Sequence, residues 1–491
     1  MTSFRESVLV ILDTSRTRIR AGVGIHDLLK TPAVDIPARV ALPRPTENAD
    51  PEAGPSKSSS PKVTEYLVGS QIDDALAAGH DLDISWPFAE GDISDWTQAE
   101  ALWKYVLSNQ LHFRRLTMES PVLLSIFPSL SRDSYERLGQ LFFERFNVAG
   151  FSILERPMAQ FYAAVPGSNA DLSGVVVDVG QRYTDITPIR DGFPVLNARE
   201  TISCGLEDCK RYLAWLLRTN QSVMNALFPD GPKSQEETQS VLVSLARKIF
   251  EDGLVKVLGE GEAADIEEEG ITDIAAVVVA GKEKAIIESG MKKRANAKAS
   301  AAEQARAREI EAMDLVSVEF GDKSVTVGKD RHRFCEPLFD PALLKGIPTL
   351  PGDNRRKDEE TLRPLQVAVA QSVGKIEPDI RQYIWQGLFV TGDITDHTKG
   401  LGAALQARLS PFILGTADHA NEVQPKSIRV LKIPEYFAEY RDKGDGLASF
   451  LGSSIVAKIA FTDSSGKNFV SKGDYASRGP KVILEMSSGL L

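Results

Sequence analysis

Short apolar runs that end in a polar or glycine-containing turn recur along the chain. They cover residues 8–12, 174–179 and 388–391, and they lead into Asp13, Gly180 and Gly392-Asp393. Runs of this length that are rich in β-branched residues predict buried strands. After the first two turns, residues 19–23 and 184–189 have the pattern of a second hairpin strand. Two such units, whose Asp13 and Asp178 lie 165 residues apart, predict duplicated halves.

Apolar residues at helical spacing lie between these strands. Three stripes follow this pattern: 99, 102, 103, 106 and 107; 138, 141, 142 and 146; and 206, 209, 213, 216 and 217. Each predicts a helix with one face in the core. Ser94-Asp95-Trp96 precedes the first stripe and is expected to cap this helix.

Two segments differ from the rest of the chain. Residues 43–62 are rich in proline and serine, which predicts a mobile loop because such a segment buries little apolar surface. Residues 259–313 are rich in Glu, Ala, Lys and Arg. The basic cluster of this second segment is either a phosphate contact or a solvated helix face.

Composition narrows the classes of function. A chain of 491 residues has room for two to four domains. Acidic residues outnumber basic ones, 68 to 57, so the net charge of −11 argues against broad, non-specific binding to nucleic acid or to an anionic membrane. The three cysteines lack zinc-finger or redox spacing, which predicts a reduced, intracellular protein. No apolar stretch is long enough to span a bilayer, and the N-terminal run is too short for a signal peptide.

The strand–turn–strand units carry the most specific signal. Amides of such turns can surround phosphates, and a carboxylate at the strand end can hold a cation through water. The segments 13–22 and 178–185 resemble the two phosphate loops of actin. Further matches in actin's order are residues 86–88, 91, 95–96, 143–147, 191–193, 334–339, 379–381 and 451–455. The chain is identified as a member of the actin superfamily, matching over about 8–484 with breaks mainly at 43–62 and 228–318.

This resemblance implies an actin-like α/β fold, with two duplicated lobes around a central cleft and four subdomains. The implied subdomains are 1–37, 87–168 and 448–491 for the first, 38–86 for the second, 169–204 and 350–447 for the third, and 205–349 for the fourth. The second contains the 43–62 loop and the fourth contains the charged insertion. The 43–62 loop stands where actin's filament loop would lie. Ordering such a mobile loop in a filament contact would cost conformational entropy. We therefore expect a monomer or a heterodimer rather than a filament.

Departures from actin gather at the nucleotide site. Ser15, Arg16 and Thr17 replace small residues that let the backbone approach phosphate, and Gln181 and Arg182 replace an Asp-Gly pair. The two arginines either pair with phosphate or block the site. The residues expected to form this degenerate site are Asp13, Ser15, Arg16, Thr17, Arg20, Asp178, Gly180, Gln181, Arg182, Gly392 and Asp393.

The positions that orient water in actin are also changed. Arg156 stands at the position of actin's glutamine, and Asp185 at that of its histidine. We expect no catalytic residue, no resident metal and no cofactor, and therefore negligible ATPase activity. Because Asp13, Asp178 and Gly180 persist, weak ATP binding stays open.

Within the superfamily, the chain resembles the nuclear actin-related proteins, and among them the actin-related protein nine class of fungal chromatin remodellers. Residues 4–11, 178–189 and 434–452 carry this resemblance. It implies a structural subunit of SWI/SNF- and RSC-type complexes in the nucleus, which contacts other remodeller subunits, pairs with a second actin-related protein and binds the helicase–SANT-associated helix of the motor subunit. It implies indirect or weak contact with DNA or histones and none with membranes.

The resemblance also points to a cleft for the partner helix. Apolar anchors of such a helix enter a groove, and the matching residues here are Tyr162, Phe193, Val456, Ile459 and Phe461. Val456, Ile459 and Ala460 are three and four positions apart, so we expect them to share one helix face. The alternative is that these residues are simply core.

Two other functions compete with this one. An ATP-binding or ATP-hydrolysing actin-like protein of the cytoskeleton would share the fold, but it conflicts with the replacements at the nucleotide loops. A direct histone or DNA binder would explain the charged insertion, but it conflicts with the acidic total and with the lack of an aromatic-plus-basic pattern.

Overall fold

The computed structural model describes residues 4–25, 30–44, 61–128, 130–165, 172–229, 231, 234–257, 314–348, 362–413, 425, 427–463 and 468–486. Most of the predicted loop 43–62 and the whole charged insertion 259–313 lie outside these residues. The chain divides into two compact units. The first unit comprises residues 1–176, 189–195 and 431–491, and the second comprises 177–188 and 196–430. The boundaries of the four subdomains stay a prediction.

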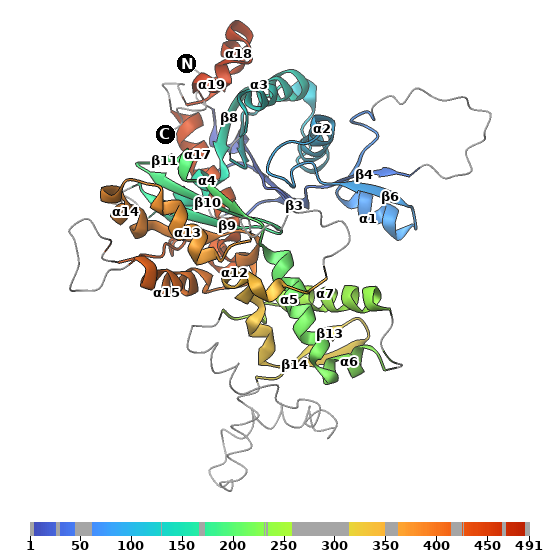
Figure 1. The fold of residues 1–491 in the computed structure, drawn as a ribbon. Helices are drawn as coiled ribbons and strands as arrows, with labels where there is room; N and C mark the ends of the chain where they lie inside the picture. The colour runs from blue at the N-terminus through green and yellow to red at the C-terminus, as the bar shows by residue number, and fades with distance from the viewer. Residues whose placement is uncertain are drawn as a thin grey trace. The chain divides into compact units, whose positions relative to one another are not determined.

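A six-stranded sheet forms the centre of the first unit (Figure 1), with the order β16-β8-β7-β1-β2-β3. Its strands are β1 (Val10–Thr14), β2 (Arg18–Val23), β3 (Val34–Pro37), β7 (Val122–Ile126), β8 (Gly150–Glu155) and β16 (Val470–Ser471). The predicted hairpin is confirmed, because β1 pairs antiparallel with β2 and Asp13 lies opposite Arg20. The first strand begins later than predicted, since Val8 belongs to the short 3-10 turn Glu6–Val8 and is exposed.

A small three-stranded sheet in the first unit has the order β5-β4-β6. It comprises β4 (Val40–Pro43), β5 (Leu67–Val68) and β6 (Leu82–Ser85), and it is accompanied by helix α1 (Ser70–Ala77). Ala41, Ile72 and Leu82 form its separate small core. The residues around the predicted Pro/Ser loop therefore fold as a sheet with one helix.

The first helical stripe is confirmed as a core face. Helix α2 (Trp96–Tyr105) begins where the Asp95 carboxylate accepts hydrogen bonds from the amides of Thr97 and Gln98, at 2.7 and 3.1 Å. Trp103 is fully buried, and its ring lies 5.3 Å from Phe88 and 5.7 Å from Phe142. The other helices of the unit are α3 (Arg132–Gln140), α4 (Arg156–Ala164), α16 (Ala438–Lys443), α17 (Ala448–Thr462), α18 (Lys472–Arg478) and α19 (Val482–Met486).

Two of these helices continue as π-helical turns. Helix α2 runs into the turn Val106–Gln110, and α3 runs into the turn Leu141–Phe146. Each turn is followed by a non-glycine residue with a left-handed backbone, His112 at φ 60° and Asn147 at φ 63°. Such conformations are uncommon outside glycine and cost free energy.

Helices α4 and α17 pack against each other within the first unit (Figure 1). A Cβ atom on Gly452 would lie 1.7 Å from the carbonyl oxygen of Ala159. Only glycine therefore permits the observed approach of the two helix backbones. This contact fixes α17 over the end of the sheet that carries Asp13, since Ser449 of α17 hydrogen bonds to that residue.

A second sheet has the order β11-β10-β9-β15, with β12 also paired to β10. Its strands are β9 (Gly174–Val179), β10 (Thr184–Arg190), β11 (Phe193–Pro194), β12 (Glu200–Ile202) and β15 (Leu388–Thr391). The predicted strands 174–179, 184–189 and 388–391 are thereby confirmed. In the second unit, β13 (Val316–Phe320) and β14 (Lys323–Val327) form a separate hairpin.

The helices of the second unit carry its core. They are α5 (Leu206–Thr219), α6 (Gln221–Leu227), α7 (Gln235–Glu251), α12 (Glu336–Phe339), α13 (Leu365–Gly374), α14 (Pro378–Ile384) and α15 (Leu401–Ile413). All three cysteines, Cys204, Cys209 and Cys335, are buried in this unit, and none of them forms a disulfide. Burial raises the pKa of Cys335 to about 12. Burial also raises the pKa of Cys209, and its neighbours Cys335 and Cys204 add to the shift.

Candidate functional site

In the turn between β1 and β2, the backbone amides donate hydrogen bonds to acceptors within the turn itself. The hydroxyl of Ser15 accepts hydrogen bonds from the amides of Thr17 and Arg18, at 3.3 and 2.9 Å. The amide of Ser15 in turn donates to the carbonyl oxygen of Arg18, at 2.8 Å. These amides belong to the loop that was expected to cradle phosphate. In this structure the Ser15 side chain already satisfies two of them.

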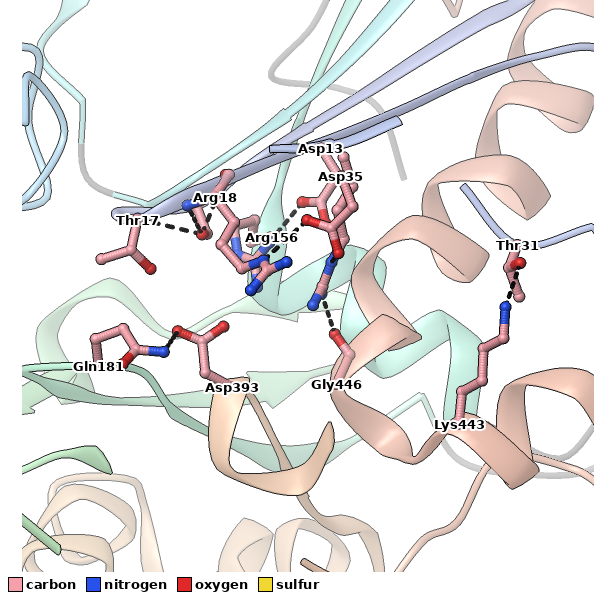
Figure 2. A network of polar contacts seen from close by, with 12 residues as sticks. Asp13, Thr17, Arg18, Thr31, Asp35, Arg156, Gln181, Asp393, Lys443 and Gly446 are labelled. Atoms are coloured by element: carbon pink, nitrogen blue, oxygen red, sulfur yellow. Dashed lines mark hydrogen bonds and ion pairs between the residues drawn. The ribbon is translucent and has the colours of Figure 1, made fainter. Parts of the chain in front are cut away.

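A buried ion pair lies at the end of β1. Arg156, the first residue of α4, donates from Nη1 to Oδ1 of Asp13 at 2.6 Å, and both side chains are buried. Ser449 of α17 donates to the same carboxylate oxygen at 2.8 Å (Figure 2 draws the Arg156–Asp13 contact). The other oxygen, Oδ2, is buried and has no hydrogen-bond partner among the described residues. An internal cation thus neutralises the carboxylate expected to organise a metal ion.

The other arginines near the first loop, Arg16, Arg18 and Arg20, contact neighbouring residues of the first unit. Arg20 is buried and donates to the carbonyl oxygen of Gly446 at 2.6 Å, while both Arg18 and Arg20 bind the carboxylate of Asp35. The Arg16 guanidinium lies against Gly91, because a Cβ atom on Gly91 would be 2.6 Å from Nη1. The structure therefore places Arg16 and Arg20, two of the three arginines predicted for the site, against the first unit's own backbone.

The second loop is closed by a different set of contacts. The amide of Gly180 donates to the carbonyl oxygen of Tyr183 at 2.9 Å. Arg182 forms an ion pair of 3.2 Å with Glu207 on α5, and both side chains are partly exposed. The carbonyl oxygens of Gly180 and Gln181 accept the amides of Leu206 and Glu207. This loop is thus tied to the start of α5 rather than to a buried charge.

Gln181 and Asp393, two predicted site residues that are far apart in sequence, are brought together. The Gln181 amide nitrogen donates to Oδ2 of Asp393 at 3.0 Å (Figure 2), and Lys210 donates to the Gln181 amide oxygen at 3.4 Å. Burial lowers the pKa of Lys210. Gly392 has φ 108°, and a Cβ there would lie 2.5 Å from Oδ1 of Asp178. A side chain at position 392 would displace Asp178.

Asp185, at the position of actin's histidine, is bound to a neighbouring strand. Thr201 of β12 donates to its carboxylate at 2.6 Å, and the two residues are paired across β10 and β12. In the described part of the chain, no group of three or more His, Cys, Asp or Glu side chains is arranged to hold a metal ion.

The five residues predicted for the partner-helix cleft differ in how far they are exposed. Phe193 and Ile459 are 52% and 54% exposed. Tyr162 is half-buried, its hydroxyl donates to the carbonyl oxygen of Gly192 at 3.4 Å, and burial raises its pKa to about 12. Val456 and Phe461 are buried, so the alternative interpretation as core describes these two.

The three residues expected to share one face of α17 differ in exposure. Val456 and Ala460 are 3% and 1% exposed, whereas Ile459 is exposed. Positions three and four apart lie on opposite sides of the starting residue, since each step turns a helix by about 100°. The edge of the core falls between Ile459 and Ala460.

Several residues of the site were not found from the sequence. Ser449, Asp35, Gly446 and Glu207 each complete a contact described above. Ser449 and Asp13 are separated by 436 positions, and no spacing pattern connects them. Glu207 is the exception, because the acidic first turn of α5 is visible in the sequence as Glu207-Asp208.

The fold and these loops define a class of protein. The model of the family described as Actin matches residues 5–486, and the chain belongs to the actin family. The prediction of membership made from the loop motifs is therefore confirmed. Within the described residues, no helix is both long and apolar enough to cross a membrane.

Named relatives refine this class. The chain is 26% identical to the "SWI/SNF and RSC complexes subunit arp9" of Schizosaccharomyces pombe, over 98% of this chain and 99% of that protein. It is 29% identical to "Actin-related protein 3" of Oryza sativa, from both subspecies indica and japonica, over 31% of this chain and 36% of those proteins. The predicted similarity to the actin-related protein nine class is thereby confirmed over nearly the whole length.

Proposed function

We propose that this protein is a non-catalytic subunit of a SWI/SNF- or RSC-type chromatin-remodelling complex in the nucleus. In this proposal it pairs with a second actin-related protein and binds the helicase–SANT-associated helix of the motor subunit. Full-length similarity to the fission yeast subunit supports membership of such a complex. The observation that carries the non-catalytic role is the buried ion pair between Asp13 and Arg156.

This ion pair opposes the use of Asp13 in nucleotide chemistry. A carboxylate that organises a cation must offer its charge to that cation, and here a guanidinium 2.6 Å away already neutralises it. A metal ion bound at Asp13 would face the positive charge of Arg156 in a buried site, where like charges repel strongly. The residues of the first loop therefore do not fit a nucleotide–cation complex of the kind that actin holds.

The second loop supports the same conclusion independently. Gly392-Asp393 resembles the Gly-Gly turn that lies against the adenosine in actin, so Asp393 would add a carboxylate beside a negatively charged ligand. The Gln181 side chain already donates to this carboxylate. Arg182 is paired with Glu207, so its charge is directed to α5. These contacts support a site that is held together by the protein's own side chains.

A phosphate-release assay tests the non-catalytic role. We expect the purified protein to release no phosphate from Mg-ATP above the buffer background. The reason is that Arg156 and Asp185 stand in place of the glutamine and histidine that orient the attacking water in actin. Release that disappears in an Asp13→Ala variant would show that the first loop is catalytic and would overturn this part of the proposal.

The exposed apolar residues of the first unit support helix binding. Phe193 lies beside Gly192, and a Cβ on Gly192 would be 3.5 Å from the Tyr162 hydroxyl and 3.6 Å from Leu172. Leu172 is itself exposed. Tyr162 and Leu172 thus lie near the residue that precedes the exposed Phe193, and Ile459 lies on α17, which packs on the helix that carries Tyr162. Apolar side chains of a bound helix would cover such a surface.

Binding of the motor helix tests this surface. We expect Phe193→Asp and Ile459→Asp each to weaken binding of the helicase–SANT-associated peptide at least about tenfold, since central apolar anchors contribute most of the binding free energy. The measurement is calorimetric titration of the peptide into the full chain. Leu76→Asp, on α1, is the matched control, because Leu76 is also an exposed apolar residue of the first unit. Unchanged affinity in both variants would exclude this surface.

A further inference from the structure

A basic pocket in the first unit lies outside both nucleotide loops. It has a volume of about 210 Å³ and is lined by the end of α2, the two π-helical turns and the loop 113–118. Its charged lining consists of Lys104, Arg114, Arg115 and Arg145, with Glu100 as the one carboxylate. An excess of cations is unexpected in a chain with a net charge of −11. We propose that this pocket binds a phosphate monoester whose phosphate is attached to an apolar or aromatic group.

Two of the four cations are available to a ligand. Arg145 forms an ion pair with Glu100 at 2.9 Å, and Arg115 donates to the carbonyl oxygen of Glu144 at 2.8 Å. Lys104 and Arg114 are exposed, and neither side chain has an ion-pair or hydrogen-bond partner among the described residues. Glu100 thus balances Arg145, and the other cations of the pocket leave a net positive charge. This charge suits a dianionic ligand better than a ligand with one carboxylate.

The rest of the lining is apolar. Leu107, Met118 and Phe146 are buried, and Phe113 is half-buried. A water molecule occupies about 30 Å³ of liquid, so the pocket has the volume of roughly seven waters. A bare phosphate would fill only part of that space and would leave the volume beside the apolar side chains empty. An attached ring or aliphatic group would cover them.

The backbone around the pocket is held in uncommon conformations. Leu107 and Ser108 come from one π-helical turn, and Arg145 and Phe146 come from the other. π-Helical turns and left-handed non-glycine residues are frequent at functional sites, and His112 and Asn147 are both of the second kind. Asn147 also donates to the carbonyl oxygen of Arg115 at 2.9 Å, which ties the 113–118 loop to the end of the second turn. The pocket walls are therefore braced without a ligand.

A second basic cavity shows why charge balance matters. In the second unit, Arg363 and Lys375 line a larger cavity beside Glu200. Both cations pair with this buried carboxylate, at 2.5 and 2.9 Å. Each of these cations has an anionic partner and together they keep one uncompensated charge, whereas Lys104 and Arg114 have no anionic partner among the described residues. The pocket of the first unit is the better anion site of the two.

Calorimetric titration of the full chain with phenyl phosphate tests the proposal. Near neutral pH a phosphate monoester is mainly dianionic. We expect phenyl phosphate to bind more tightly than inorganic phosphate or phenylacetate, because only phenyl phosphate has both the dianion and the ring. Raising the salt concentration should weaken binding. No binding, or equally tight binding of phenylacetate, would overturn the proposal.

Charge reversal locates the binding site. We expect the double variant Lys104→Glu/Arg114→Glu to weaken phenyl phosphate binding at least about tenfold, since it replaces the two unpaired cations by anions. The matched control is Arg132→Glu/Lys481→Glu, which makes the same charge change at two exposed positions of the first unit outside the pocket. An equal loss in the control would show a general charge effect and would overturn the assignment. Hydrogen exchange of both variants checks that the unit stays folded.

One more probe distinguishes a phosphorylated side chain of a protein from a small phosphorylated molecule. A pentapeptide with phosphotyrosine between glycines presents the same phosphate and ring on a peptide backbone. Binding of this peptide at least as tight as that of phenyl phosphate would assign the pocket to a phosphorylated side chain of a protein. Binding of phenyl phosphate alone would assign it to a small phosphorylated molecule.

Discussion

The two strand–turn–strand units of this protein have been closed in different ways. At the β1–β2 turn, the carboxylate of Asp13 is buried and paired with a buried arginine. At the β9–β10 turn, Arg182 and Glu207 pair while partly exposed to water. Both loops resemble phosphate loops, yet one is held by a charge pair that has lost its hydration and the other by contacts that solvent weakens. Similar departures from actin's loop sequences can therefore have very different energetic consequences.

The physical origin of this difference is the dielectric environment. A buried charge that loses its partner is left without water to replace it, whereas an exposed charge is rehydrated. The first loop should thus be intolerant of single changes and the second tolerant. Four substitutions would break or sharpen this contrast, and all can be measured by hydrogen exchange on peptides of the unit concerned.

The largest effect is expected at Arg156. Arg156→Met leaves the Asp13 carboxylate buried and unpaired, and breaking a buried pair in this way costs about 3–5 kcal/mol of unfolding free energy. The double variant Asp13→Asn/Arg156→Met removes both charges and should recover most of the loss. A single variant as stable as the original protein would show that the pair is not strongly desolvated.

The second-largest loss of unfolding free energy is expected at Ser449. Its hydroxyl donates to the buried Asp13 carboxylate at 2.8 Å, so Ser449→Ala should cost about 1.5–3 kcal/mol, the usual range for a hydrogen bond to a charged group. Ser453→Ala is the control in the same helix, because that buried hydroxyl donates to the helix carbonyl of Ser449 instead. Equal losses in the two variants would mean that the carboxylate contributes nothing special.

Ser15 tests the turn itself. Ser15→Ala removes the acceptor of the Thr17 and Arg18 amides, and we expect a loss of about 0.5–1.5 kcal/mol, as for an ordinary neutral hydrogen bond. Ser15→Thr keeps the hydroxyl and should lose less. If Ser15→Ala gained affinity for inorganic phosphate, the freed amides would still be arranged to bind an anion.

The smallest effect is expected at Arg182. Its ion pair with Glu207 is partly solvated, so Arg182→Ala should cost about 0–1 kcal/mol, and less at high salt. Arg182→Lys, which keeps the charge, is the control. A loss as large as that of Arg156→Met would remove the contrast between the two loops.

The sequence predicted the elements that local pattern determines. The β9 strand, the Asp95 cap and the buried stripe of α2 follow from alternation, capping chemistry and helical spacing, all of which act over a few residues. The family could be predicted because its loop motifs are local too. Position 156 was recognised as altered, but not as the partner of Asp13.

The remaining contacts depend on residues that meet only in the folded chain. Ser449 reaches Asp13 across 436 positions, and Gly446 reaches Arg20 across 426. On α17, spacing alone could not place Ile459 outside the core, because the boundary is set by where α4 lies. The basic pocket was missed for the same reason, since Lys104 and Arg145 share no local pattern.

The burial of every cysteine has a practical consequence. A thiol reacts as the thiolate, so the raised pKa values of Cys209 and Cys335 make both slow to modify in the folded unit. A dye attached through a single engineered cysteine on an exposed position would therefore label this protein selectively, with the native thiols left in place. Maleimide uptake by the unaltered chain would in turn report that the second unit has opened.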